Sequence, residues 1–576
     1  MTNADIARVF EEMADLLELR GENAFRVRAY RNGAKAISEL SEPVADIVND
    51  PDRKLESFNG IGATLAEKCA VLVETGKLPQ LEKLREETPP VLQKMTRIPG
   101  LGAKKAMALQ KELGIETLNE LRQACVDQRV RALKGFAAKT EQLILDGLEI
   151  AEAASQRIRI DEAEKLVDRL QQHLETCQAI ERLAFAGSFR RGQETVGDID
   201  ILVVSSEHTP VMDRLESFPG LVSVIVRGDT KMSVRVDDQF QVDLRVVPAS
   251  SFGAALQYFT GSKEHNVELR GRARKMGMTV NEYGVAKIES PDEYVCGSEE
   301  ADVYEVLGLP AIAPELRQGG REFQWAEGGA KQSEVLAAED IVSDLHMHTT
   351  ASDGAQTIQQ MADAARELGR THIAITDHSK RVSMANGLDE QRLLDQWQEI
   401  DRINESAADD FRILKGVECD ILEAGPLDIR DEVLAQADWV IASVHYGQKQ
   451  SREEITARIV GALENPHVDA IAHPTGRLIG SRPPYEVDLV AVMEAAAEYG
   501  KALELNASPR RLDLCVDHLV MAAARGIPIT INTDAHASAG MAVMRYGVVQ
   551  ARKAWLQADQ IVNAWSLERM LEWLQR

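Results

Sequence analysis

Residues 340–576 alternate between short apolar segments and helical patterns, and this alternation constrains the fold more than any other feature. The apolar segments, each followed by a helical pattern, are IVSDLHMH, THIAITDH, FRILKGVECD, DWVIASVH, VDAIAHP, KALELNA and IPITINTDAH. Strands that are separated by helices pair in parallel, so the pattern predicts an α/β barrel. In such barrels the carboxyl ends of the strands carry the chemistry.

Histidines and carboxylates gather at those carboxyl ends. Nine of the twelve histidines of the chain lie after residue 340. A single histidine at a strand end is usually a satisfied core residue, but a whole set on one face predicts a metal centre. Mixed imidazole and carboxylate ligands suit Zn²⁺ or Mn²⁺. The set is His346, His348, Asp353, His378, Glu418, His445, His473, Asp534 and His536, whereas His372, His467 and His518 lie outside it and are expected to be structural.

A second cluster of carboxylates is predicted in the first half of the chain. The stretch TVGDIDILVV (195–204) has the pattern of a strand, on which Asp198 and Asp200 point to the same face. A later strand, FQVDLRVVP (240–248), carries a lone Asp243. Because buried like charges are costly, three carboxylates on adjacent strands indicate two divalent cations, Mg²⁺ or Mn²⁺. Such a pair activates an attacking hydroxyl group and stabilises a departing pyrophosphate.

The helical region from 1 to about 150 contains a repeated turn. FNGIGATLAEKCAVLVETG (58–76) and IPGLGAKKAMALQKELG (98–114) both have Gly-apolar-Gly before an amphipathic helix. The glycine pairs, Gly60 with Gly62 and Gly100 with Gly102, leave backbone amides free to hold a phosphate at the start of a helix. An ordinary glycine-capped connection would explain one copy, whereas two copies favour DNA. The turn resembles the helix-hairpin-helix motif, which binds the DNA backbone without reading sequence.

The net charge conflicts with DNA binding at first sight. It is −26, from 66 basic and 92 acidic residues. Phosphate binding by backbone amides needs few basic side chains, which reduces this conflict.

Six scattered cysteines without a CxxC pair are typical of a reducing cytosol, and no apolar run approaches the length of a membrane span. These features predict a cytoplasmic protein that has no membrane partner, and we expect it to be a monomer.

Residues 1–310 resemble the family X DNA polymerases, the group of DNA polymerase beta. GSFRRG, DID, VDLR, YFTGS and NEYG occur in the order and spacing of that family. The resemblance implies that Asp198, Asp200 and Asp243 are the catalytic metal ligands, and that Lys68 occupies the position of a Schiff-base lysine in a lyase site. It implies nucleotide contacts from Gly187, Ser188, Arg191, Gly197, Tyr258, Phe259, Gly261 and Asn266, and a DNA contact from Arg270.

Three residues depart from the polymerase beta pattern. Gln241 replaces an arginine close to the catalytic aspartate, and Lys263 and His265 replace an acidic and an aromatic residue. These changes bear on efficiency and nucleotide preference, not on the reaction.

Residues 340–576 resemble the PHP (polymerase and histidinol phosphatase) domain, a distorted seven-stranded barrel whose nine ligands hold three metal ions. All nine positions carry a residue that can bind a metal. The resemblance implies phosphoester hydrolysis with up to three Zn²⁺ or Mn²⁺ ions.

Together these features predict a multidomain gap-filling DNA repair polymerase with a 3′–5′ exonuclease or related phosphoesterase. Its substrates would be gapped or primer-template DNA and dNTPs. Two alternatives remain: a nuclease whose polymerase half is weak, and a non-catalytic scaffold that binds gapped DNA. The expected parts are a helical domain with a helix-hairpin-helix (1–80), a second helix-hairpin-helix domain (81–150), an α+β nucleotidyltransferase palm (151–248), a domain that checks the nascent base pair (249–315), a linker (316–338) and the PHP domain (339–576).

Overall fold

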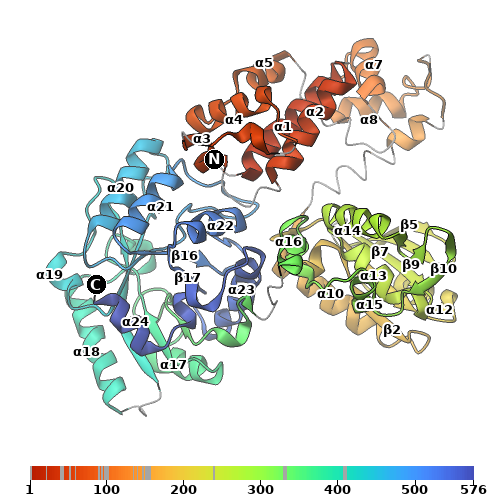
Figure 1. The fold of residues 1–576 in the computed structure, drawn as a ribbon. Helices are drawn as coiled ribbons and strands as arrows, with labels where there is room; N and C mark the ends of the chain where they lie inside the picture. The colour runs from red at the N-terminus through yellow and green to blue at the C-terminus, as the bar shows by residue number, and fades with distance from the viewer. Residues whose placement is uncertain are drawn as a thin grey trace.

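The computed structural model contains a helical N-terminal part, a mixed sheet, a small α/β part and a parallel barrel, in that order along the chain (Figure 1). No helix among the described residues is long and apolar enough to cross a membrane. The described residues are 3–575 except 21, 39–43, 51–52, 59, 88–90, 93–94, 96–100, 102, 134, 139, 146–147, 149–156, 238–239, 329–333 and 407–410.

The N-terminal helices pack their apolar faces into one cluster that runs from Ile6 to Leu148. Local signals set their ends: α4 stops at Gly76, whose φ is +69°, and Thr117 caps α8 in a capping box with Glu120. The helices are α1 (Asn3–Leu19), α2 (Ala24–Ser38), α3 (Val44–Asn49), α4 (Ala63–Thr75), α5 (Pro79–Glu87), α7 (Ala103–Leu113) and α8 (Leu118–Val126).

The mixed sheet has the order β2-β4-β7-β6-β5, with β4 and β7 parallel at its centre. Its strands are β2 (Arg182–Phe185), β4 (Asp198–Val204), β5 (Leu221–Arg227), β6 (Lys231–Val236) and β7 (Phe240–Val247). Helices α10 (Ile160–Leu174) and α12 (His208–Glu216) pack against it, and β1 (Ile158–Arg159) pairs with β3 (Thr195–Val196). A one-turn helix, α11 (Gly187–Arg190), connects β2 to β3 and lies beside β4. This is the part of the chain in which the palm is expected.

The small α/β part follows directly. It consists of α13 (Phe252–Thr260), α14 (Lys263–Lys275), the antiparallel strands β8 (Met278–Asn281), β9 (Gly284–Lys287) and β10 (Ser290–Cys296), and α15 (Glu300–Glu305).

The first portion of the expected linker, 316–338, is folded into this part. Helix α16 (Arg321–Glu327) places Phe323 in the same apolar cluster as Tyr304, and the side chain of Arg317 is buried. The sequence between 311 and 340 shows no sustained periodicity, because a seven-residue helix held by a few buried side chains is too short to leave a repeating pattern. Leu336 is already part of the barrel core, so the described chain between the two cores is short.

The barrel contains the expected parallel strands in sequence order, β11 to β17. The prediction of an α/β barrel with seven strands is therefore confirmed. A parallel bridge between Met347 and Ala535 joins the two ends of the sheet, so the barrel is nearly closed. The strands are β11 (Ser343–Asp344), β12 (His372–Ile375), β13 (Arg412–Asp420), β14 (Trp439–Ser443), β15 (Ala470–Ile471), β16 (Ala502–Asn506) and β17 (Ile529–Asn532).

Helices surround this barrel on the outside, and their apolar faces pack on the strands in one large cluster. They are α17 (Ile358–Glu367), α18 (Glu390–Ser406), α19 (Asp431–Leu434), α20 (Arg452–Glu464), α21 (Leu489–Glu498), α22 (Val516–Ala524) and α23 (Met544–Lys553). The interior is filled differently, with small alanines around Trp439. The last helix, α24 (Leu567–Leu574), joins that interior cluster through Met570 and Trp573, whereas the carboxyl ends of the strands carry polar side chains.

We predict that Trp573→Ala destabilises the barrel by about 3–5 kcal/mol, because it leaves a cavity beside Trp439 and Trp565. Leu571→Ala is the matched control on the same helix, since Leu571 is 37% exposed, and it should change stability by less than about 1 kcal/mol. Urea unfolding followed by tryptophan fluorescence measures both. Equal effects of the two substitutions would contradict a role for α24 in the barrel core.

Candidate metal centres

Three carboxylates meet at the centre of the mixed sheet. Asp198 and Asp200 lie on β4, and Asp243 lies on β7, where it is the direct partner of Asp200. Paired residues on neighbouring strands point to the same face, as do residues two apart on one strand. The sheet therefore brings together the three residues that the sequence singled out.

Electrostatics make this cluster a fit for cations. Burial first, and then the charges of Asp198 and Asp243, raise the pKa of Asp200 to about 7. The pKa of Asp198 is also raised, by burial and then by Asp243. Without cations, both desolvation and mutual repulsion oppose the ionisation of all three carboxyl groups. Oxygen ligands in this number suit hard divalent ions.

Two neutral side chains orient Asp243. The amide Nε2 of Gln241 donates to Asp243 Oδ2 over 2.9 Å, and the hydroxyl of Ser233 donates to Asp243 Oδ1. Gln241 thus contacts the aspartate near which polymerase beta has an arginine. Ser233 was not singled out by sequence, because its contact depends on the antiparallel register of β6 against β7.

The turn between β2 and β3 lies against this cluster. Gly187 has a φ of +64°, and a Cβ at this position would lie 2.4 Å from Asp200 Oδ2, so only glycine fits. Ser188 follows it in α11. Arg191 donates to the carbonyl of Thr260, and burial lowers the pKa of its guanidinium. A Cβ at Gly261 would lie 3.2 Å from Arg191 Nη1.

The predicted contacts on the small α/β part also lie together. Asn266 Nδ2 donates to the carbonyl of Tyr258 over 2.7 Å, and Arg270 Nε donates to the carbonyl of Asn266 over 3.1 Å. The ring of Phe259 packs edge-on against Tyr258 at 5.2 Å. Gly197 precedes Asp198, and a Cβ there would lie 3.1 Å from an arginine nitrogen.

His265 is a buried member of the same part and explains one departure from the family pattern. It stacks on Phe323 and lies between Glu322 and Tyr304, with ring nitrogens 2.8 and 2.9 Å from their oxygens. Burial lowers its pKa despite the neighbouring Glu322. The imidazole fills an aromatic position in the core and is not directed toward a substrate.

The structure describes only some of the N-terminal residues that were predicted to bind DNA or to act in a lyase site. Gly60 has a φ of +91°, and Gly62 is the N-cap of α4. Gly100 and Gly102 lie outside the described residues. Lys68 is on α4, 9% exposed, and donates to Gln80; burial lowers its pKa, and the charge of Arg26 lowers it further.

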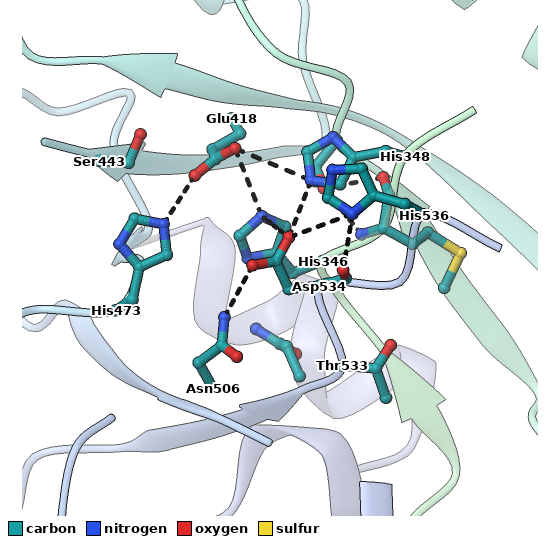
Figure 2. A network of polar contacts seen from close by, with 12 residues as sticks. His346, His348, Glu418, Ser443, His473, Asn506, Thr533, Asp534 and His536 are labelled. Carbon is teal, nitrogen blue, oxygen red and sulfur yellow. Dashed lines mark hydrogen bonds and ion pairs between the residues drawn. The ribbon is translucent and has the colours of Figure 1, made fainter. Parts of the chain in front are cut away.

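The nine histidines and carboxylates at the carboxyl ends of the barrel strands form one continuous cluster. Figure 2 shows part of it, with His346, His348, Glu418, His473, Asp534 and His536 labelled. His473 Nε2 lies 3.1 Å from Glu418 Oε1 and joins the cluster through that carboxylate. The other eight fall into three overlapping groups that could each hold an ion: His348, Asp353, His378 and His536; His346, His348 and Asp534; His378, Glu418 and His445.

Charge and geometry in this cluster both fit metal binding. Despite burial, surrounding histidines hold the pKa values of Glu418 and Asp534 well below the ordinary range. Burial lowers the pKa of His348 to about 3, which leaves a neutral ring with a lone pair to donate. His346 Nε2 is buried, makes no hydrogen bond and lies 3.5 Å from Glu418 Oε2, which also lies 2.6 Å from His378 Nδ1. A buried imidazole nitrogen that lies near a carboxylate and makes no hydrogen bond is available to a cation.

The backbone at two of these residues is strained. Asp534 has a φ of +54° and His473 a φ of +29°, although neither is glycine. Strain of this kind persists only where the surrounding structure enforces it, and it concentrates at functional sites.

Buried acids that the sequence prediction missed hold the metal-binding side chains in place. Glu504 on β16 lies 2.7 Å from His346 Nδ1 and accepts the backbone N–H of His473, also at 2.7 Å. Asp420 accepts the backbone N–H of His445 at 2.9 Å and lies 3.1 Å from its Nδ1. Such partners fix the ring orientation of metal-bound histidines. The available signal was an acidic residue in an otherwise apolar buried strand, as in ALELNA (502–507).

Five family models together match most of the chain up to residue 508. They describe a helix-hairpin-helix domain (1–78), a SAM-like helix-hairpin-helix tandem (92–149), a DNA polymerase beta palm (157–242), a DNA polymerase beta thumb (255–318) and a PHP domain (344–508).

Relatives resemble either the whole chain or one half of it. The DNA polymerase/3′-5′ exonuclease PolX of Bacillus subtilis (strain 168) is 40% identical over the full length of both chains. DNA polymerase lambda of Rattus norvegicus is 26% identical over 55% of this chain and 56% of its own. A probable phosphatase of Acetivibrio thermocellus is 38% identical over 29% of this chain and 65% of its own.

We predict that Glu504→Gln weakens metal binding in the barrel by about 10- to 100-fold, because it removes the carboxylate that orients His346 and His473. Calorimetric titration of Mn²⁺ into the metal-free protein measures this. Glu498→Gln, an exposed change at the end of α21, is the control and should leave affinity unaltered. An affinity of the Glu504 variant equal to that of the control would contradict the assignment.

Proposed function

Since the chain belongs to the family X DNA polymerases that carry a C-terminal PHP domain, we propose that it fills gaps in DNA and trims 3′ ends. The observation that carries this proposal is the presence of two separate clusters of side chains that could bind metal ions. One consists of three carboxylates on adjacent strands, and the other of nine side chains around the barrel mouth. The substrates proposed are gapped or primer-template DNA and dNTPs, and the protein is proposed to act as a monomer.

In the polymerase half, Asp198, Asp200 and Asp243 would hold two Mg²⁺ or Mn²⁺ ions. These ions would supply activation of the primer hydroxyl and charge neutralisation on the pyrophosphate. Asp243 is proposed to assist the 3′-hydroxyl, and its orientation by Gln241 and Ser233 supports that role. Fixed groups of this kind need no rearrangement during the reaction.

The other nucleotide contacts would come from two neighbouring elements. Ser188 and Arg191 are proposed to bind the triphosphate, and their closeness to the carboxylate cluster supports this role. Tyr258 and Phe259 would lie against the sugar and base of the nucleotide. Asn266 would sense the nascent base pair. Gly197 and Gly261 are also proposed nucleotide contacts, and their lack of a side chain lets Arg157 and Arg191, respectively, pack close to the backbone.

DNA contacts are proposed for two further groups of residues. Arg270 would reach the minor groove, and the glycine turns at 60–62 and 100–102 would hold backbone phosphates through their amides. Lys68 would serve a lyase activity only if its amine were released from Gln80.

In the barrel, the proposed ions are up to three Zn²⁺ or Mn²⁺, which suit the mixture of imidazole and carboxylate ligands. They would supply an activated water molecule and polarise the scissile phosphate. The ligands themselves hold the site in shape, since Glu418 contacts His378, His445 and His473 at once. We propose hydrolysis of phosphodiesters at DNA 3′ ends as the reaction.

We predict that Asp198→Ala or Asp200→Ala lowers nucleotide insertion on a one-nucleotide gap by at least roughly a thousandfold, or about 4 kcal/mol. Binding of gapped DNA and 3′-end hydrolysis should stay within a few-fold. The melting temperature of Asp200→Ala should not fall, because the change removes repulsion from a buried carboxylate. Single-turnover insertion assays with Mg²⁺ measure the loss, and wild-type insertion by either variant would refute the palm assignment.

We predict the opposite pattern for the barrel. His346→Ala, His348→Ala or His473→Ala should remove 3′-end hydrolysis and spare primer extension. These histidines belong to a different domain from the three carboxylates of the palm. Release of nucleotides from a labelled 3′ end, with Mn²⁺ present, measures the loss. If these variants kept hydrolysis while Asp198→Ala lost it, the nuclease would belong to the palm.

A further inference from the structure

The segment that carries Ser188 and Arg191 is held by the barrel as well as by its own domain. We call residues 187–194 the phosphate turn. Helix α23 lies on the side of the barrel that faces α10 and α16 (Figure 1). From there it reaches the C-terminal end of the phosphate turn.

Helix α23 donates three hydrogen bonds to this turn. The carbonyl of Gly192 accepts from Gln550 Nε2 at 3.0 Å and from Lys553 Nζ at 3.3 Å. Lys553 Nζ also donates to Gln193 Oε1 at 2.9 Å. Lys553 is only 5% exposed, so its ammonium group depends on these acceptors in place of water.

A second connection comes from the loop after β15. Arg477 Nη2 lies 2.5 Å from Glu194 Oε1, and the same guanidinium donates to the carbonyls of Arg511 and Leu512. Arg477 therefore fastens the last residue of the phosphate turn to two segments of the barrel.

The interface around these bonds is close-packed. Leu512 and Tyr546 of the barrel belong to the apolar cluster beneath the mixed sheet. Gly192 has a φ of +59°, and a Cβ there would lie 2.4 Å from Val549 Cγ1. The two domains thus meet without space for the turn to shift toward α23.

The opposite side of the turn is fixed as well. Arg190 donates to both carboxylate oxygens of Glu300, at 2.8 and 2.7 Å, and to Thr260 Oγ1 at 2.8 Å. Arg317 donates to the same Glu300 at 2.7 Å. The phosphate turn is therefore held between the small α/β part and the barrel, and buried networks of this kind are rigid when fully satisfied.

We propose that the barrel is a structural part of the nucleotide-binding site. Lys553, with Gln550 and Arg477, is a positioning residue for polymerisation: it holds the phosphate turn so that Ser188 and Arg191 meet the triphosphate in one geometry. This inference rests on the proposed role of those two residues. The inference gives the barrel a second role, in nucleotide binding, besides the hydrolysis proposed for its metal cluster.

The test is the steady-state kinetics of single-nucleotide insertion by the full chain on a one-nucleotide gap. Lys553→Met should raise the KM for the dNTP roughly tenfold, because small displacements of a positioning group are costly, while kcat changes less. Its 3′-end hydrolysis should stay within twofold, since Lys553 contacts no residue of the metal cluster. Arg545→Met is the matched control: it removes a cation from the same helix and interface, but Arg545 contacts Glu164 on α10, not the turn.

A double-mutant cycle separates the direct link from general damage. Arg477→Met and Glu194→Gln should each raise the KM, and the double variant should be no worse than the worse single one. Gln550→Leu, a milder change, serves if Lys553→Met does not fold.

An unchanged KM in the folded Lys553 or Gln550 variant would overturn the inference, as would an equal rise in Arg545→Met. If the unaltered chain inserts no nucleotide at all, the proposed function fails and this inference fails with it.

Discussion

The gathering of several carboxylates in one buried site is the constraint on which both halves of this chain depend. In the mixed sheet, β4 and β7 hold Asp198, Asp200 and Asp243 on one face, where burial and mutual repulsion raise the pKa of Asp200 to about 7. Only a stiff scaffold keeps such groups together before cations arrive. Parallel strands supply that stiffness in both domains. In the barrel, histidines interleave with the acids and hold the pKa values of Glu418 and Asp534 below the ordinary range.

Most of the sequence-based prediction of the barrel and of the two clusters rests on the periodicity of strands and on the position of strand ends. A period of two places Asp198 and Asp200 on one face, whatever the neighbouring strands are. The carboxyl ends of parallel strands meet at one mouth, which is why the nine barrel side chains could be grouped before their distances were known. The seven-stranded order follows from alternation of strands and helices in the sequence. These inferences need only local patterns and one general rule about barrels.

Contacts that depend on register or on docking could not be predicted in the same way. Glu504 supports His346 across 158 positions of the chain, and Ser233 meets Asp243 only because β6 and β7 pair in one particular register. The segment near Phe323 has no periodic pattern, yet one buried aromatic ring fastens it to the core. The bonds from Lys553 to the phosphate turn cross between domains, so no pattern in either segment indicates them.

The net charge of −26 is a poor guide to the potential that DNA would meet. Asp377, Glu418, Asp420, Glu504 and Asp513 are all at most 1% exposed, and they are directed toward histidines, hydroxyls or backbone amides inside the barrel. Each divalent ion bound at a carboxylate cluster would offset two such charges. Backbone amides in the turn at Gly60 and Gly62 are proposed to hold phosphates without a lysine. Because amides carry no net charge, they do not release the counterions that are condensed on the DNA. The net charge of the whole chain therefore overstates the negative charge that its surface presents to DNA.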